Sequence, residues 1–283
     1  MKLSVVVPAR NEASTIAATL QRLGERLARE HIDYELLVVD DGSADQTVER
    51  VEQRRHEDGH VRLVLNTGQH GFGRAVRCGI DHSSGDAVVI VMADGSDDPE
   101  DVVKYYYVLR DRAECAFGSR FIRGAYVERY PLPKLVLNRL ANHLIRLLFR
   151  IDYNDITNAF KGYRKYVIDG VRPLISPHFN LTVEIPLKAI VRGYSYEVVP
   201  ISWRERKAGR SMFHIQEMGS RYFFIILHVW LEWLLVKNDY YRTDQDSAAR
   251  WLRVSPAQAR PPEAGGAVSE LRPLSSPTRT GLR

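Results

Sequence analysis

Cysteine is scarce in this sequence, which contains only Cys78 and Cys115. Two cysteines this far apart can form neither a disulfide framework nor a zinc site, so we expect a reducing compartment. Both are expected to be buried as small apolar residues. We also expect no signal peptide, because the strand-like KLSVVVP (2–8) shows no charged region, apolar stretch and cleavage site of the kind that a signal peptide has. We therefore expect the folded part to stay in the cytoplasm.

Apolar runs of membrane-spanning length are absent as well. The strongest candidate is residues 213–236, which become apolar nearly all round from Tyr222 and are interrupted by His228 and Glu232. Its most apolar stretch, about fifteen residues, would reach only about 22 Å against a hydrocarbon core of roughly 30 Å. Its flanking tryptophans and basic residues suit a helix that lies in a membrane interface, and a buried core helix or a dimer seam is the alternative.

Glycine-rich nucleotide loops of known spacing are missing. Residues 70–79 contain Gly71 and Gly73, but they fit neither G-x-G-x-x-G nor a Walker A motif. Positive charge is in excess, because the net charge is +5 and residues 120–150 hold seven basic residues against Glu128 as the only acid. Such a stretch suits a solvated helix face or an anionic partner. Without a basic motif that interleaves aromatics, nucleic acid is the least favoured partner.

Strand-like and helix-like stretches alternate through the first half of the chain. Runs rich in β-branched residues at 3–7, 35–39, 61–65 and 87–92 alternate with helical patterns at about 12–30, 44–56, 71–82 and 99–112. This order predicts an α/β fold of βαβ units with a mostly parallel sheet and flanking helices. Further strand signals lie at 114–117 and 196–203.

The pattern changes in the second half. Residues 134–150 predict a helix that places Leu137, Leu140, Leu144 and Leu148 on one stripe. Pro, Ser, Arg and Gly without periodicity dominate after residue 243, which predicts a disordered tail. We therefore expect an α/β domain over 1–212, an amphipathic or membrane-interface helix over 213–242 and a tail over 243–283.

Two acid-rich segments follow strand-like runs, LLVVDDGSADQT at 36–47 and VVIVMADGSDDPE at 88–100. A strand that ends in carboxylates brings negative charge to the carboxyl edge of a sheet, where open α/β folds bind ligands. Asp-Gly-Ser clusters also occur in ordinary solvated turns. Two such strand ends in one α/β half favour a site for a metal and a nucleotide. The first strand adds polar groups there, because it leads through Arg10, Asn11 and Glu12 into a helix whose amides suit phosphate.

Together these motifs resemble glycosyltransferase family 2 enzymes of the GT-A fold. The matching residues are P-A-R-N-E (8–12), D-D-G-S (40–43) with Asp45 and Thr47, Asn66 with Gly71 and Gly73, and A-D (93–94) before Ser96. The downstream motifs are G-S-R (118–120), D-x-T-N-A-F-K-G-Y (155–163), V-E-I (183–185) and V-P-I-S-W-R-E-R-x-x-G-x-S (199–211). They resemble the polyprenol-phosphate sugar transferases, which include dolichol-phosphate mannose synthase. The resemblance covers about residues 3–213.

The resemblance implies a role for particular residues. Those implied in nucleotide-sugar binding are Pro8, Arg10, Glu12, Val39, Asp41, Ala93, Asp94, Arg120 and Arg206. A Mg²⁺ or Mn²⁺ ion would be held by Asp94, with Ser96 and Asp97. The implied catalytic set is Asp94, Arg120, Asp155 and Arg206, and the acceptor phosphate would be bound by Lys134, Arg139 and Ser211. Planar arginine forks suit phosphate, and the cation neutralises a departing diphosphate.

The implied activity is inverting transfer of a hexose from GDP-mannose or UDP-glucose to a polyprenyl phosphate. The enzyme would be peripherally attached to the cytoplasmic membrane surface, and a homo-oligomer stays open. A phosphate monoester has its second pKa at about 6 and is therefore already anionic at neutral pH, so the nucleophile needs no strong general base. One alternative is a family 2 transferase with a soluble saccharide or small-molecule acceptor. Another is a nucleotide-sugar-binding partner protein without catalysis.

Three positions depart from the family pattern. Met92 stands where the metal motif usually has its first Asp, and a thioether does not suit a hard cation. Asp97 or Asp98 either supplies a second oxygen ligand or only begins the following helix. Arg10 replaces a tyrosine and Met212 replaces a lysine, and by charge count Arg10 offsets that loss.

Overall fold

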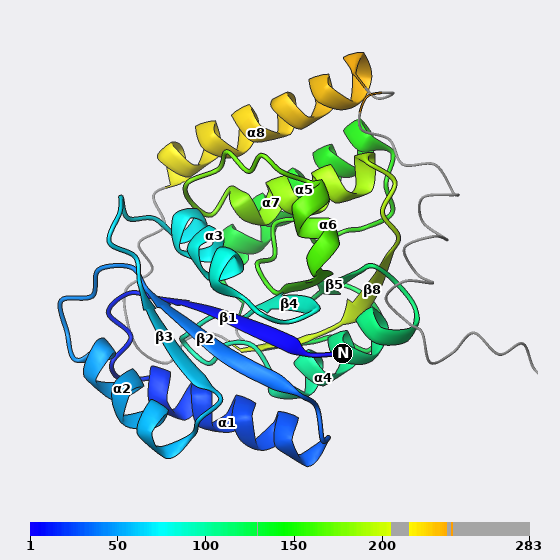
Figure 1. The fold of residues 1–283 in the computed structure, drawn as a ribbon. Helices are drawn as coiled ribbons and strands as arrows, with labels where there is room; N and C mark the ends of the chain where they lie inside the picture. Colours follow the sequence, from blue (N-terminus) through cyan, green and yellow to red (C-terminus); the bar gives the residue numbers. More distant parts are fainter. Residues whose placement is uncertain (129, 205–214, 237–238, 240–283) are drawn as a thin grey trace, which may run out of the picture. The chain divides into compact units, whose positions relative to one another are not determined.

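The computed structural model describes residues 1–128, 130–204, 215–236 and 239. A seven-stranded sheet has the order β3-β2-β1-β4-β7-β5-β8 (Figure 1), and β6 pairs with β9 in a second sheet. Neighbouring strands of the large sheet are parallel except at β7, which is antiparallel to both β4 and β5. The strands are β1 (Leu3–Ala9), β2 (Tyr34–Asp40), β3 (Val61–Leu65), β4 (Ala87–Ile90), β5 (Cys115–Ser119), β6 (Tyr126–Glu128), β7 (Lys161–Arg164), β8 (Tyr196–Pro200) and β9 (Ser202–Arg204).

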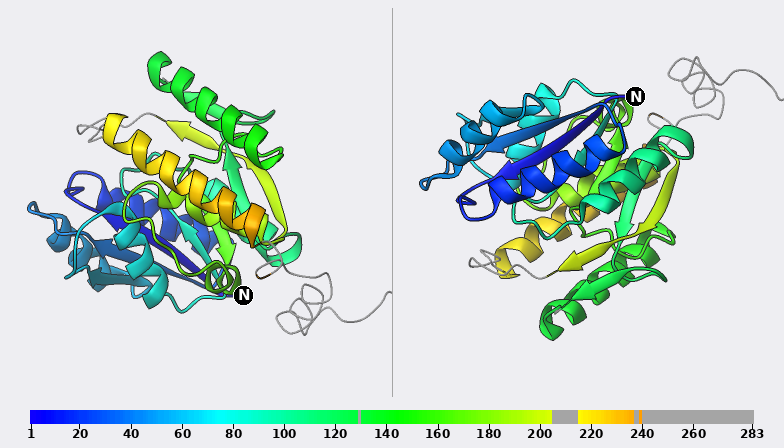
Figure 2. Two further views of the ribbon diagram at one scale, coloured as in Figure 1. Left: turned by 90° about the horizontal axis from the view of Figure 1, so that it is seen from above. Right: turned by 90° about the horizontal axis from the view of Figure 1, so that it is seen from below.

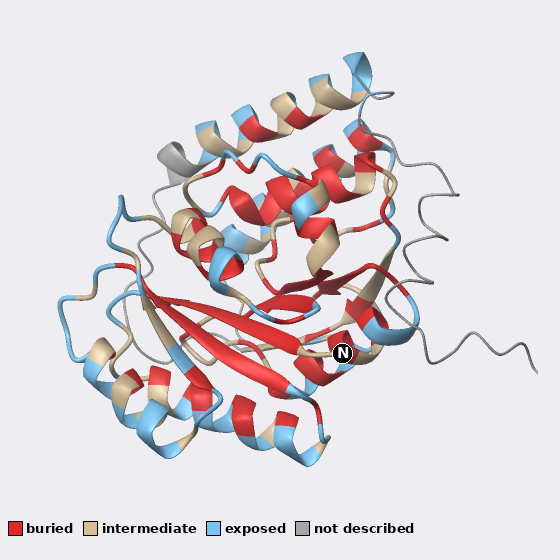
Figure 3. Cartoon of the chain, in the orientation of Figure 1, coloured by how far each residue is buried: buried red, intermediate tan, exposed pale blue. Residues whose placement is uncertain are grey.

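Helices cover both faces of the large sheet. They are α1 (Ile16–Arg29), α2 (Thr47–Glu57), α3 (Phe72–His82), α4 (Pro99–Asp111), α5 (Leu132–Phe149), α6 (Lys165–Gly170), α7 (Leu181–Val191) and α8 (Ile215–Leu235). α1, α2 and α4 lie on one face, α3, α6 and α7 lie on the other, and α8 lies outside α7 (Figure 1). The central strands are buried on both faces (Figure 3), because alternate side chains of β1 enter opposite cores, Val5 and Val7 one and Val6 the other.

The predicted α/β fold with a mostly parallel sheet is confirmed. The βα order of the first half is as expected, and Asp98 caps α4 by accepting a hydrogen bond from the Glu100 amide. Of the two cysteines, Cys115 is buried as predicted, whereas Cys78 is only half-buried, so the prediction for it was wrong in degree. β7, α6 and α7 were not predicted, because their residues show neither clear alternation nor a polar face.

Hydrogen bonds and an ion pair to Glu35 fix the amino edge of the sheet. The Glu35 carboxylate, which is buried, accepts hydrogen bonds from the Ser4 hydroxyl at 2.5 Å and from the Ser84 amide at 2.6 Å. It also pairs with Arg62. Burial alone would raise the pKa of Glu35, but these hydrogen bonds lower it to about 2. This edge is therefore a fixed structural end, opposite the edge where ligands are expected.

The connections place a topological switch point beside β1. The chain leaves β1 for β2 and β3 on one side and later returns to β4 on the other side. The loop after β4 therefore lies beside the loop after β1 at the carboxyl ends of these strands, which is where open α/β folds bind ligands. The acidic residues of both segments lie at this edge, because β2 ends at Asp40 and β4 ends at Ile90.

The leucine stripe predicted for α5 exists, but it faces outward. Leu137, Leu140, Leu144 and Leu148 are all exposed. α8 lies next to α5 (Figure 2) and exposes Phe223, Phe224, Leu231, Leu234 and Leu235 in turn. We call these side chains, with Leu147 of α5, the α5/α8 apolar face. In the part of the chain that the structure covers, no helix has both the length and the apolar character needed to cross a bilayer. The predicted tail at 243–283 lies outside the described residues.

Candidate active site

The loops after β1 and β2 are tied together at the carboxyl edge. The Asn11 amide donates to the Ser43 hydroxyl at 2.9 Å, and the Asn11 side-chain oxygen accepts from the Ala44 amide at 2.8 Å. The Glu12 amide donates to the Thr47 hydroxyl at 2.8 Å. These contacts join loops that lie more than thirty residues apart in the chain, and we call the joined loops, residues 10–12 and 41–47, the rim. The contacts explain why the motifs P-A-R-N-E and D-D-G-S are rich in polar residues.

The Asp41 side chain points to the loop that follows β3 and bonds to it. Its buried carboxylate accepts one hydrogen bond from the Asn66 side chain and one from the Gly71 amide, each at 2.7 Å. Gly71 has φ of +149°, and a Cβ there would lie 2.5 Å from the Pro177 carbonyl oxygen, so only glycine fits. Gly71 and Asn66 thus belong to the motif because they complete the support of Asp41.

The other residues predicted for the nucleotide lie around the same rim. Pro8 and Val39 are register partners in β1 and β2, and both are buried. Arg10 is exposed at the end of β1, and Glu12 is half-buried. The structure therefore gathers these positions at one edge of the sheet, with Arg10 the most accessible of them.

The turn after β4 carries the predicted metal ligand. The Asp94 carboxylate accepts a hydrogen bond from the Ser96 amide at 3.0 Å, and Gly95 between them has φ of +72°. The Ala93 carbonyl accepts from the Thr19 hydroxyl of α1 at 3.1 Å. The turn is therefore fixed from below by α1, with Asp94 only partly buried.

Asp97 is placed differently from Asp94. Its side chain is only 5% exposed and accepts a hydrogen bond from the Met92 amide at 2.8 Å. Burial raises the pKa of Asp97 to about 7, the Met92 amide opposes this, and the charge of Asp94 adds to it. The Asp97 carboxylate is thus buried against the Met92 amide, and its role as a second metal ligand stays a prediction.

The turn suits a cation that is held mainly by its substrate. No group of three or more His, Cys, Asp or Glu side chains that could hold a metal ion exists among the residues that the structure covers. Mg²⁺ commonly takes only one or two carboxylates and completes its shell with phosphate oxygens and water. Asp94, a partly accessible carboxylate at the switch point, fits that pattern, and a cation there would offset the repulsion between Asp94 and Asp97.

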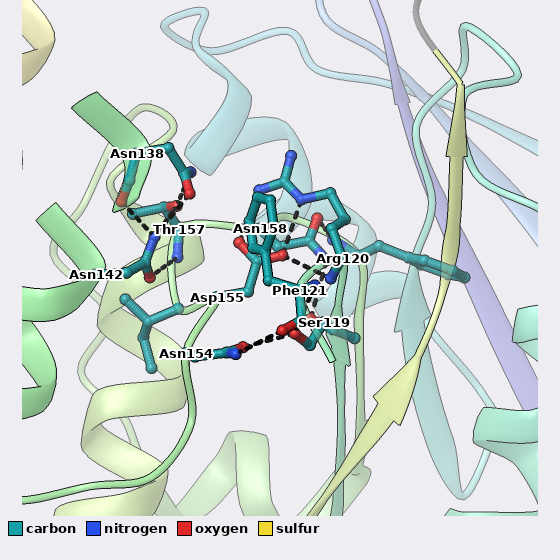
Figure 4. Close-up of polar contacts among 12 residues, drawn as sticks. Ser119, Arg120, Phe121, Asn138, Asn142, Asn154, Asp155, Thr157 and Asn158 are labelled. Atoms are coloured by element: carbon teal, nitrogen blue, oxygen red, sulfur yellow. Dashed lines mark hydrogen bonds and ion pairs between the residues drawn. The ribbon is translucent and has the colours of Figure 1, made fainter. Parts of the chain in front are cut away.

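Arg120 and Asp155 form a buried ion pair (Figure 4). The Asp155 carboxylate accepts from Arg120 Nε and Nη2, each at 2.8 Å, and from the Arg120 backbone amide at 3.0 Å. The two side chains are 9% and 0% exposed. Burial would lower the pKa of Arg120, but the Asp155 hydrogen bonds and charge raise it above its ordinary value. These two predicted catalytic residues therefore meet, although they lie 35 positions apart in the chain.

Trp203 joins the ion pair to the turn after β4. Its backbone forms an isolated antiparallel bridge with Asp97. The Arg120 guanidinium lies 6.0 Å from the Trp203 ring centre and 5.3 Å from that of Tyr130. The Arg120 charge also opposes the rise in the pKa of Asp97 that burial causes. We did not single out Trp203 from the sequence, although it lies inside the V-P-I-S-W motif.

The residues predicted for the acceptor phosphate are only partly described. Ser211 lies outside the described residues, as does Arg206, which is predicted to contact the nucleotide sugar. Lys134 is exposed in the first turn of α5. Arg139 donates to the Asn154 carbonyl at 3.1 Å, and its guanidinium lies 4.6 Å from the centre of the Phe121 ring. Arg139 therefore lies against the segment that carries the Arg120–Asp155 pair.

Lys161 is a functional candidate that the sequence reasoning missed. Its buried amino group donates to the carbonyls of Ile156 at 2.9 Å and Thr182 at 3.2 Å, and also to the carbonyl of Asn158. Burial lowers the pKa of Lys161 to about 7. Its position in the K-G-Y part of the motif was the available signal.

Comparison with known proteins shows consistent similarities. The profile for glycosyl transferase family 2 matches residues 4–172. Polyprenol monophosphomannose synthase of Mycolicibacterium smegmatis is 30% identical over 233 residues, which cover 77% of this chain and 86% of that protein. Dolichol-phosphate mannosyltransferase of Pyrococcus furiosus is 31% identical over 215 residues, which cover 75% of this chain but only 59% of that protein.

A solved structure shares the fold. Glucosyl-3-phosphoglycerate synthase of Mycobacterium tuberculosis, in complex with Mn²⁺, UDP-glucose and phosphoglyceric acid, superposes with a TM-score of 0.62. The similarity covers 82% of this chain and 79% of that chain at 19% sequence identity. At this identity the comparison concerns the fold alone, and it agrees with the α/β architecture described above.

Proposed function

The chain belongs to glycosyl transferase family 2, and on this premise we propose that it transfers a hexose from a nucleotide diphosphate sugar to a polyprenyl phosphate. Both curated relatives have names that specify mannose and a polyprenol or dolichol, which favours GDP-mannose over UDP-glucose as donor. The observation that carries the proposal is the convergence of the β1, β2 and β4 loops beside Asp94 at the switch point.

The donor would lie along the rim at the carboxyl edge. Glu12 and the strand ends at Pro8 and Val39 would contact the nucleoside, and the exposed Arg10 would approach its phosphates. A Mg²⁺ or Mn²⁺ ion, when bound at Asp94, would neutralise the diphosphate as it leaves. Arg120 would act from its fixed position beside Asp155, because a charge held by buried partners needs no reorganisation during the reaction.

The transfer itself needs little proton chemistry. An oxygen of the acceptor phosphate attacks the anomeric carbon, the bond from that carbon to the diphosphate oxygen breaks, and the nucleoside diphosphate leaves with the electron pair. The attacking oxygen is already ionised at neutral pH. Lys134 and Arg139 of α5 would hold the acceptor phosphate together with Ser211, and Arg206 stays a proposed contact of the nucleotide sugar. Alignment of the two substrates would therefore supply most of the rate enhancement.

The α5/α8 apolar face supports a membrane location for the acceptor. Leu144, Leu147 and Leu148 of α5 and Trp230 and Trp233 of α8 line a groove of about 640 Å³. An exposed patch of this kind, rimmed by arginine, is typical of a surface that lies in a membrane interface. We propose that 1–212 is the catalytic domain and that α8, with α5, rests on the cytoplasmic leaflet.

A direct transfer assay tests the proposal. Purified protein with Mn²⁺ and a short polyprenyl phosphate is given radiolabelled GDP-mannose or UDP-glucose, and label is counted in the organic phase. We expect label from one donor, its loss in Asp94→Ala, and retention in the control Asp98→Asn, which keeps a capping oxygen for α4. The proposal is contradicted if neither GDP-mannose nor UDP-glucose gives lipid-linked label. Label on a soluble saccharide instead would support the alternative acceptor.

A further inference from the structure

A cluster of amide and hydroxyl groups binds α5 to the loop that follows Asp155 (Figure 4). Thr157 Oγ1 accepts hydrogen bonds from the Asn138 side chain at 2.7 Å and from the Asn142 side chain at 3.1 Å. The Asn142 side-chain oxygen in turn accepts from the Thr157 amide at 3.4 Å. We call Asn138, Asn142 and Thr157 the amide clamp.

The amide clamp is a main attachment of the first half of α5. The buried residues of this helix are Asn142, Ile145 and Phe149, and none of the residues 132–141 is buried. Leu132, Val136, Leu137 and Leu140 of that half are exposed, so apolar packing contributes little to its position. A buried amide is costly to leave unpaired, and polar contacts are directional, so the clamp fixes the helix in one register.

The clamped loop is the one that carries Asp155. Thr157 lies two residues after Asp155, whose carboxylate is occupied by Arg120. On the other side, the amino group of Lys161 holds the carbonyls of Ile156 and Thr182. The loop is therefore anchored to the sheet by Arg120 and Lys161, and the amide clamp joins it to α5.

We propose that Asn138 and Asn142 are positioning residues for sugar transfer, which set the place of α5 relative to Asp155 by holding Thr157. This rests on the proposed function, because α5 carries Lys134 and Arg139, the cations assigned to the acceptor phosphate. The donor rim is held by separate hydrogen bonds between the β1 and β2 loops. The β1–β2 part of the donor rim therefore does not depend on Thr157, and we expect the clamp to act mainly on the acceptor.

Paired substitutions at Thr157 test this role. Thr157→Val keeps the shape but removes the oxygen that both amides share, whereas Thr157→Ser keeps that oxygen. We expect Thr157→Val to lower kcat/KM for polyprenyl phosphate roughly 10- to 100-fold, as misplaced reacting groups do. Thr157→Ser should restore it, and the affinity for the donor, measured by calorimetry, should stay at the wild-type value in both. Asn138→Ala is the second disrupting variant, and His143→Ala, exposed on the same helix, is the control.

Hydrogen exchange gives a readout that does not need turnover. We expect amides 154–158 to exchange faster in Thr157→Val than in wild type, while β1 and β2 keep their protection. Unchanged exchange in this loop overturns the inference, and so does a donor affinity that falls as far as kcat/KM for the acceptor. If the wild-type protein transfers no sugar, the proposed function fails, while exchange still decides whether the clamp orders the loop.

Discussion

The buried Arg120–Asp155 pair should respond strongly to loss of one charge. Asp155→Asn keeps the size of the side chain but removes the negative charge that three N–H groups of Arg120 contact. Arg120 is then left as an uncompensated charge at a site that is 9% exposed. Breaking one partner of a buried pair typically costs about 3–5 kcal/mol of unfolding free energy. The aromatic rings around the guanidinium offset only part of this, at most about 2 kcal/mol.

Thermal and urea unfolding measure the effect. In a domain of this size each kcal/mol shifts the Tm by about 2–4 °C, so Asp155→Asn should melt roughly 6–20 °C below wild type. The control is Asp81→Asn, whose partner Arg172 forms an exposed pair with side chains that are 40% and 50% exposed. That substitution should change the unfolding free energy by no more than about 1 kcal/mol.

Two results would refute this reasoning about the pair. The first is an Asp155→Asn variant that unfolds within about 1 kcal/mol of the Asp81→Asn control, because the buried charge would then need no partner. The second concerns the double variant Arg120→Met with Asp155→Leu, which replaces both charges by apolar groups. It should recover most of the stability but no transfer activity, since burying apolar side chains avoids the desolvation cost. A double variant as unstable as Asp155→Asn would mean that shape, not charge, holds this site together.

Three further changes have expected outcomes. The pKa of Glu35 is lowered to about 2 in the folded protein. The stabilisation that the Glu35 carboxylate provides is therefore complete above the unfolded pKa of ~4.3 and is lost as the pH falls through about 2. Glu35→Gln should flatten this part of the dependence of the unfolding free energy on pH, measured by urea unfolding. Gly71→Ala should lower the Tm because its Cβ meets a carbonyl oxygen, at a cost above about 1 kcal/mol, whereas Gly59→Ala, with open space around it, should not. Leu147→Glu, in the α5/α8 apolar face, should reduce sedimentation with anionic vesicles. The control Leu65→Glu, at an exposed leucine of β3, should leave sedimentation unchanged. Equal binding of vesicles by the two variants would argue against a membrane contact at the α5/α8 apolar face.

The sequence by itself determined the order of the first eight elements and the edge of the sheet to which the proposed site is assigned. Runs of β-branched residues that alternate with amphipathic stretches are local patterns, and parallel βαβ connections bring all carboxyl ends to one side. Asp94 and the D-D-G-S turn could therefore be placed at that edge from the pattern of residues alone. The cap at Asp98 could be predicted for the same reason, because a capping side chain bonds to an amide two residues away.

Only the tertiary structure decided how distant polar groups meet. It placed Lys161 in the middle of the sheet, turned Asp41 toward Asn66 and Gly71, and joined Arg120 to Asp155. No short sequence pattern predicts these three arrangements, because a buried charged group is stable only where a distant part of the chain supplies its partner. The outward direction of the α5 leucines has the same origin. The helix period defines a stripe, but the stripe that faces the core is the one that holds Asn142, Ile145 and Phe149, whose partners come from distant parts of the chain.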